Sequence, residues 1–192
     1  MALSNAQVKV EHREILLKER PKKLYEISSK ATVPVLYINK DKIIDESLDI
    51  MLWVIQKWHC NWLNIEKEKQ LDMININDSD FKYYLDRYKY YDRYPELSFK
   101  DYQKKCEKYL NEYNHILQDK LYFFGNQIQL VDVALFPFIR QCAHVDSSWF
   151  EEKFINLNKW LNAIKSSNIF LSVMHKYEIW NQNNPGIITI YK

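Results

Sequence analysis

The side chains best suited to nucleophilic or metal chemistry are three cysteines and five histidines. The cysteines, Cys60, Cys106 and Cys142, lie far apart and form no CxxC pair. An odd number of widely spaced thiols predicts neither a disulfide framework nor a cysteine zinc site, and it suits a reducing compartment. The histidines are His12, His59, His115, His144 and His175. None follows HxxxH or HExxH spacing, so the sequence predicts no metal site.

Glycine content and charge exclude two further classes of function. The only glycines are Gly125 and Gly186, too few for a glycine-rich phosphate loop of either common type. The 27 Lys and Arg residues nearly balance 25 Asp and Glu residues, leaving a net charge of +2. Neither half of the chain has the basic excess that phosphate-backbone binding requires, so a nucleic-acid partner is not expected.

One tyrosine-rich segment, residues 82–93, nevertheless interleaves aromatic and basic side chains. Such a pattern could stack RNA bases. Asp86 and Asp92 interrupt the basic residues, however, and helical spacing places several tyrosines on one face. We interpret the segment as a packed or dimer-facing helix, which could also line a pocket for an electrophile.

The elements that would position chemical groups differ between the two halves of the chain. Residues 8–15 begin with alternating apolar and polar side chains, which predicts a half-buried strand, and Pro21 suits the start of a short helix. Residues 33–38 and 43–44 predict two strands joined by a polar turn. Apolar residues at helical spacing follow from Leu48. Residues 1–57 therefore form an α/β unit.

Helices replace strands beyond Lys57. We expect a polar linker over residues 58–78 and an all-helical domain over 79–192, although the β-rich end, from residue 181, finds no place in this scheme. The helices are predicted near residues 81–91, 98–120, 130–142, 154–165 and 169–177. No apolar run is long enough to span a bilayer and the start lacks a signal-peptide pattern, so we expect a cytoplasmic protein without a membrane partner.

Two ordered groups of residues carry a family resemblance. The first is Thr-Val-Pro-Val-Leu at 32–36 with Ile-Asp-Glu-Ser-Leu-Asp-Ile-Met at 44–51. The second is Phe-Gly-Asn at 124–126 with Leu-Val-Asp-Val-Ala-Leu-Phe-Pro-Phe at 130–138. Together they resemble cytosolic glutathione S-transferase-like proteins, in particular the bacterial, cysteine-type branch. The resemblance implies an α+β thioredoxin-like unit, here incomplete, followed by an all-α helical bundle.

The resemblance also implies a site for glutathione. The backbone N–H and C=O of Val33 would pair with the cysteinyl part of the peptide, presented by a cis bond to Pro34. Ser47, at a helix N-terminus, would bind the γ-glutamyl carboxylate, and Glu46 would face the ammonium group. Arg20 matches a basic position that contacts the glycyl carboxylate. The alternatives are an edge-strand proline, an ordinary helix cap and a solvated arginine.

The family's nucleophile, a cysteine, serine or tyrosine, lies at the start of the first helix, in a segment without a counterpart here. Residues 1–6 resemble the tail of that helix, so we predict no catalytic residue. Loss of the preceding strand would leave residues 8–15 without a neighbour and expose ladder edges. We hypothesise that the sequence starts at an internal methionine or comes from a decayed gene.

The second group of residues contains a departure from the family pattern. A Ser or Thr usually caps the buried helix, and an acid three residues later reaches back to the cap. Here Gln129 takes the capping position, which should weaken the cap by about 1 kcal/mol. We assign Asp132 a structural role.

The leading functional hypothesis is a glutathione-dependent transferase or thiol transferase. Glutathione would be the co-substrate, and a small hydrophobic molecule or a mixed disulfide would lie against the helical half. The alternative is a non-catalytic glutathione-binding or interaction protein, or a truncated remnant without the nucleophile. The resemblance also makes a homodimer plausible.

Overall fold

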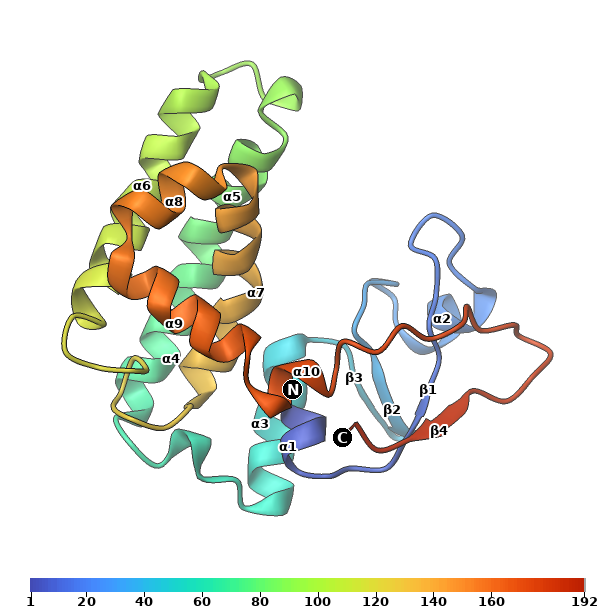
Figure 1. The fold of residues 1–192 in the computed structure, drawn as a ribbon. Coiled ribbons are helices and arrows are strands. Elements are labelled where there is room, and N and C mark those ends of the chain that lie inside the picture. The colour runs from blue at the N-terminus through green and yellow to red at the C-terminus, as the bar shows by residue number, and fades with distance from the viewer. Residues whose placement is uncertain (192) are drawn as a thin grey trace. The chain divides into compact units, whose positions relative to one another are not determined.

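The computed structural model describes residues 1–191, and the chain divides into two compact units (Figure 1). Met1–Cys60 and the residues from Ser167 onward form the first, which we call the mixed unit. Asn61–Ser166 form the second, the helical unit. This division differs from the expected domains, because the C-terminal residues pack with the first sixty instead of extending the helical bundle.

The mixed unit contains two antiparallel two-stranded sheets. One joins β2 and β3, and the other joins β1 to β4, which comes from the C-terminal residues. The strands are β1 (Val10–His12), β2 (Leu36–Asn39), β3 (Lys42–Ile44) and β4 (Ile187–Thr189). The helices are α1 (Ala2–Asn5), α2 (Lys22–Ile27), α3 (Ser47–Trp58) and α10 (Asn168–Leu171).

The pairing of β1 with β4 corrects the expectation that the strand within residues 8–15 lacks a neighbour. Val10 lies opposite Thr189, and His12 lies opposite Ile187. A second contact, in which the backbone N–H of Trp180 donates to the carbonyl of Glu14 at 2.8 Å, extends the attachment. The C-terminal tail, residues 173–191, therefore satisfies backbone groups that the sequence left without partners.

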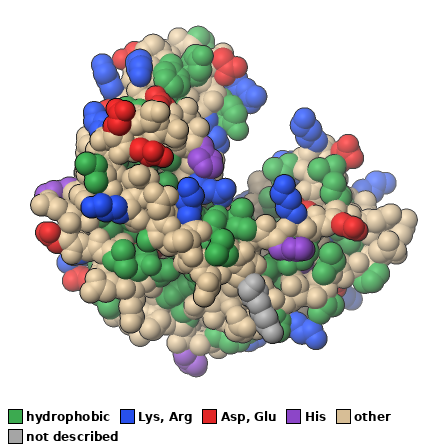
Figure 2. All heavy atoms as spheres, viewed as in Figure 1, with side chains coloured by type: hydrophobic (Ala, Val, Ile, Leu, Met, Phe, Trp, Pro, Cys, Tyr) green, Lys and Arg blue, Asp and Glu red, His purple; other side chains and the backbone are tan. Residues whose placement is uncertain are grey.

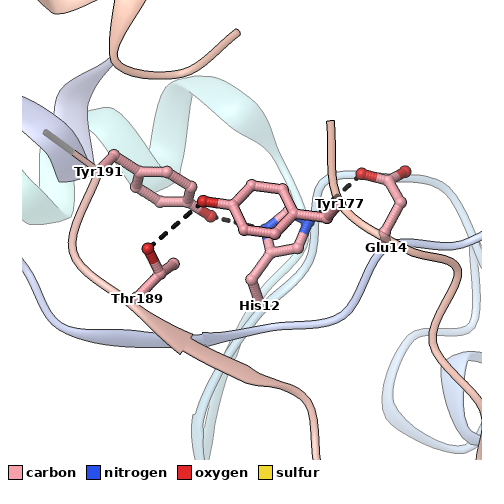
Figure 3. A network of polar contacts seen from close by, with 5 residues as sticks. All are labelled: His12, Glu14, Tyr177, Thr189 and Tyr191. Carbon is pink, nitrogen blue, oxygen red and sulfur yellow. Dashed lines mark hydrogen bonds and ion pairs between the residues drawn. The ribbon is translucent and has the colours of Figure 1, made fainter. Parts of the chain in front are cut away.

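The tail also explains why the last helix is shorter than expected. Helical spacing suggested residues 169–177, but α10 ends at Leu171. Tyr177 instead stacks on the ring of His12, with the ring centroids 4.2 Å apart. Its hydroxyl lies 3.3 Å from Oγ1 of Thr189, as Figure 3 shows. Packing against β1 thus replaces the helical continuation.

The helical unit is built mainly from six α-helices. They are α4 (Lys67–Ile76), α5 (Lys82–Lys89), α6 (Phe99–Ile116), α7 (Leu130–Val145), α8 (Ser147–Lys153) and α9 (Ile155–Lys165). Short 3-10 turns occur at Asn61–Leu63 and Tyr91–Arg93, and a π turn at Asn77–Phe81 joins α4 to α5. The predicted linker over 58–78 is therefore largely helical, since α4 consists mostly of good helix formers.

The helices α4 and α7 are joined through the side chain of Gln70, which is fully buried. Its amide N–H donates to the carbonyl of Ile65 at 2.6 Å, and its oxygen accepts the backbone N–H of Val131 at 3.1 Å. Gln70 thereby satisfies one of the first N–H groups of α7, which have no partner within the helix.

Asp132 is fully buried and holds the start of α7 in place. It accepts hydrogen bonds from the backbone N–H groups of Phe123 and Gln129, at 3.1 and 2.8 Å, and from the indole N–H of Trp160 at 2.8 Å. Burial raises the pKa of this carboxyl to about 6. These contacts agree with the predicted structural role. Gln129 and Asp132 are arranged as a capping box at the start of α7, while Oε1 of Gln129 has no hydrogen-bond partner among the described residues.

The tyrosines of α5 divide between core and surface. Tyr88 is fully buried, as predicted for a packed helix, whereas Tyr83 is 49% exposed. The guanidinium of Arg87 lies over the ring of Tyr83, with its carbon 3.4 Å from the ring centroid.

On the face seen in Figure 2, basic and acidic side chains are interspersed, in keeping with the balanced composition. No helix within residues 1–191 is long and apolar enough to cross a membrane.

Candidate functional site

The segment before β2 presents a free stretch of backbone. The peptide bond between Val33 and Pro34 is cis, as the resemblance implied. Val33 is 45% exposed. The backbone N–H and C=O of this residue have no hydrogen-bond partner among the described residues. These two groups can therefore form an antiparallel-type pair with the backbone of a bound peptide.

The N-terminus of α3 supplies a second set of donors in the same unit. Ser47 is the first residue of this twelve-residue helix, and Glu46 occupies the N-cap without a side-chain capping bond. Ser47 is exposed, and no side-chain hydrogen bond caps this helix start within residues 1–191. A helix start with free N–H groups and a hydroxyl is suited to binding a carboxylate.

Glu46 is the partner of a lysine that the sequence analysis did not single out. Nζ of Lys30 lies 2.5 Å from Oε1 of Glu46 and 3.6 Å from Oδ1 of Asp45. The hydroxyl of Ser28 donates to the other oxygen of Asp45 at 2.8 Å. The hydrogen bond to Glu46 raises the pKa of Lys30. No spacing rule connects residues 30 and 46, which is why sequence patterns gave no signal for this pair.

Arg20 lies in a different environment from the other candidates. It lines a hollow of about 660 Å³ between the segment that follows β1 and residues 179–183 of the tail. No hydrogen bond or ion pair in the described part of the chain joins Arg20 to Val33, Glu46 or Ser47. The consecutive residues Glu46 and Ser47 thus lie at the start of α3, whereas Arg20 lies against the tail.

The cysteines do not supply a nucleophile to these residues. Cys60 follows the opposite end of α3, about 18 Å along the helix from Ser47 at the usual rise per residue, and accepts a hydrogen bond from Asn5. Cys106 and Cys142 are buried in the helical unit. A hydrogen bond with Cys106, together with burial, raises the pKa of the Cys142 thiol, which disfavours the reactive thiolate.

The described residues contain no group of three or more His, Cys, Asp or Glu side chains that could hold a metal ion. The candidate groups in the mixed unit are the free backbone of Val33, the start of α3 at Ser47, the carboxylate of Glu46 and the cation of Lys30. These groups match the parts of a small peptide with a free α-amino acid end.

Two segments of the chain match domains of one known protein family. Residues 1–62 match the glutathione S-transferase N-terminal domain, and residues 77–168 match the glutathione S-transferase C-terminal domain. The chain belongs to the glutathione S-transferase family. The predicted fold class is confirmed: a thioredoxin-like N-terminal domain and a helical C-terminal domain. No curated protein sequence matches the chain.

Solved structures share this fold at low sequence identity. BphK, a bacterial GST solved as a ternary complex, is 17% identical with a TM-score of 0.74, over 89% of this chain and 88% of that one. The glutathione transferase URE2P6 from Phanerochaete chrysosporium, in complex with oxidized glutathione, is 15% identical with a TM-score of 0.75. That match covers 90% of this chain and 86% of URE2P6.

Proposed function

We propose that this protein binds glutathione in the mixed unit, with Val33, Pro34, Glu46 and Ser47 as the binding residues. The observation that carries the proposal is that the backbone N–H and C=O of Val33 have no hydrogen-bond partner within residues 1–191, in the same unit as the open start of α3. The cysteinyl part of glutathione would pair with Val33, and the γ-glutamyl carboxylate would accept hydrogen bonds from Ser47.

Glu46 has two roles in this proposal. In the free protein it pairs with Lys30, and in the complex it would face the ligand's ammonium group. The side chain of Lys30 is 50% exposed and that of Glu46 is 56% exposed, so solvent screens the ion pair. A ligand's ammonium group can therefore replace Lys30 at little cost in free energy. Arg20 would contact the glycyl carboxylate.

Two functional classes follow from glutathione binding. Family membership supports a glutathione-dependent transferase or thiol transferase acting on a small hydrophobic molecule or a mixed disulfide, in the cytoplasm and as a homodimer, in the manner of the cysteine-type branch. The positions of the three thiols, one beyond the far end of α3 and two buried, favour the alternative of a non-catalytic glutathione-binding protein.

Calorimetric titration with glutathione tests the binding. We expect saturable binding by the unmodified chain and a loss of at least tenfold in affinity for Ser47→Ala, because a charge-assisted hydrogen bond is removed. Asp49→Ala is the matched control, since Asp49 is an exposed acid in the same first turn. Equal affinities for all three proteins would contradict the proposal.

Turnover separates the two functional classes. A transferase will consume glutathione–cysteine mixed disulfide or a chloronitrobenzene at rates above the uncatalysed reaction, and Ser47→Ala will lower kcat/KM. A binding protein will show the calorimetric result without either turnover. In a thiol-transferase reaction, glutathione thiolate attacks the mixed disulfide, which releases cysteine thiolate and leaves oxidized glutathione.

A further inference from the structure

The hollow that contains Arg20 is built from two segments of the mixed unit that are far apart in sequence. Leu16, Glu19, Arg20 and Lys22 line it on one side, and residues 179–183 of the tail line it on the other. Its volume is about 660 Å³, which is large enough for part of a small peptide. Both walls belong to the same compact unit, so the hollow is a feature of that unit alone.

The charge of the hollow suits a carboxylate. Arg20 and Lys22 make no ion pair within residues 1–191, and Glu19 is the one acid in the lining. The tail adds three amide side chains, those of Asn181, Gln182 and Asn183. Two unpaired cations beside amide N–H donors can bind an anionic group through charge-assisted hydrogen bonds.

The tail wall is held in place by contacts with β1 and the residues after it. The indole of Trp180 stacks under the guanidinium of Arg13, 4.5 Å from its carbon to the ring centroid, and the indole N–H donates to the carbonyl of Asn184 at 2.8 Å. The backbone N–H of Gly186 donates to Oε1 of Glu11 at 2.8 Å. The wall therefore has a defined position relative to Arg20.

Gly186 is where the tail comes closest to β1. A Cβ atom at this position would lie 2.6 Å from the carbonyl oxygen of His12 and 2.8 Å from Cγ of Arg13. Any larger residue at 186 must push the tail away from the strand, because the nearest atom belongs to the backbone. Gly186 does not line the hollow, so its substitution disturbs the wall without removing a lining side chain.

We propose that residues 179–183 form, together with Arg20, a carboxylate-binding subsite, and that the tail docked on β1 determines which peptides the protein accepts. The proposal rests on the proposed glutathione function and deepens it: the glycyl carboxylate binds between Arg20 and the amide wall. Ligands that lack a free carboxylate at this end bind more weakly. The C-terminal tail thus has a role in specificity as well as in completing the sheet.

The test compares two ligands: glutathione, and glutathione monoethyl ester, in which the glycyl carboxylate is blocked. Calorimetry on the full chain should show about tenfold weaker binding of the ester, the factor expected for one charge-assisted hydrogen bond. Gly186→Ala should weaken glutathione binding and leave ester binding nearly unchanged, so that the ratio of the two affinities falls towards one. Ile188→Thr is the control, because Ile188 is 59% exposed and lies in β4, two residues after Gly186.

A second variant tests the proposal independently, in case Gly186→Ala does not fold. Gln182→Glu places a negative charge in the wall without removing any contact between the tail and β1. It should weaken glutathione binding several-fold more than ester binding, and Gln118→Glu, an exposed position in the helical unit, should change neither.

The outcomes distinguish the two proposals. Two results overturn the tail subsite and leave the glutathione function standing, provided that Ser47→Ala still weakens binding at least tenfold. They are equal affinity for both ligands, and an affinity ratio that Gln182→Glu leaves unchanged. Failure of the unmodified chain to bind either ligand overturns both.

Discussion

The hydroxyl of Tyr191 lies 2.7 Å from Nδ1 of His12, although 179 residues separate them in the sequence (Figure 3). The other ring nitrogen, Nε2, lies 3.3 Å from a carboxylate oxygen of Glu14. Tyr177 stacks on the ring of the same histidine. His12, in β1, therefore contacts the C-terminal tail at two places, Tyr177 and Tyr191. This cluster is the side-chain counterpart of the backbone pairing between β1 and β4.

We predict that His12→Ala loosens the tail. The variant loses the stacking on Tyr177 and the hydrogen bond to Tyr191, so the free energy of unfolding should fall by about 1–2 kcal/mol. Trypsin cleavage after Lys176 should become faster, because that residue lies in the loosened segment. Tyr191→Phe removes the hydroxyl alone and should have a smaller effect. An unchanged cleavage rate for His12→Ala would show that the side-chain cluster does not hold the tail.

The buried carboxyl of Asp132 predicts a dependence of stability on pH. Its pKa is about 6 in the folded protein against 3.8 for the free group, so the folded state binds the proton more tightly. The unfolding free energy should therefore fall as the pH rises from about 4 to about 6, by on the order of 3 kcal/mol. Urea unfolding at several pH values measures this change.

Asp132→Asn supplies the comparison, because asparagine has a similar shape and does not titrate. The difference in unfolding free energy between the unmodified chain and this variant should shrink as the pH rises over the same interval. A difference that grows with pH would mean that the three hydrogen bonds to Asp132 outweigh burial and that its charged form is favoured.

Lys30→Met should raise the affinity for glutathione. The substitution removes the cation that pairs with Glu46 in the free protein, and it retains a side chain of similar length. The exposed pair is weak, so the gain should be about two- to fivefold by calorimetry. A fall in affinity would instead indicate that Lys30 contacts a carboxylate of the ligand.

Gly125→Ala tests backbone strain in the loop before α7. Gly125 has a φ of 129°, a backbone conformation that residues with a side chain rarely adopt. No atom lies within 4 Å of the place that a Cβ atom would take at this position. The expected loss of about 1–2 kcal/mol in unfolding free energy therefore comes from the backbone alone. Asn126→Ala, at the exposed neighbouring position, should cost less than half as much, and similar losses for both variants would argue against the strain.

Local patterns were sufficient to predict most helices and the hairpin of β2 and β3. The helices α3 and α7 also followed from short-range spacing. Two features could not be predicted from the sequence, because they depend on residues that are far apart in the chain. The partner of β1 lies about 175 residues away, and the pair of Lys30 with Glu46 depends on how two loops meet. The helix α4 was missed for a different reason: its polar composition hid a strong helix propensity.

The most direct test of the central claim follows backbone amides by NMR during a glutathione titration of the ¹⁵N-labelled chain. The proposed site predicts that the amide signals of Val33 and Ser47 shift with one common dissociation constant, because both N–H groups contact the same ligand. S-methylglutathione, with its thiol blocked, should give the same pattern. Saturable shifts confined to other residues, or no shifts at ligand concentrations in the millimolar range, would contradict glutathione binding at this site.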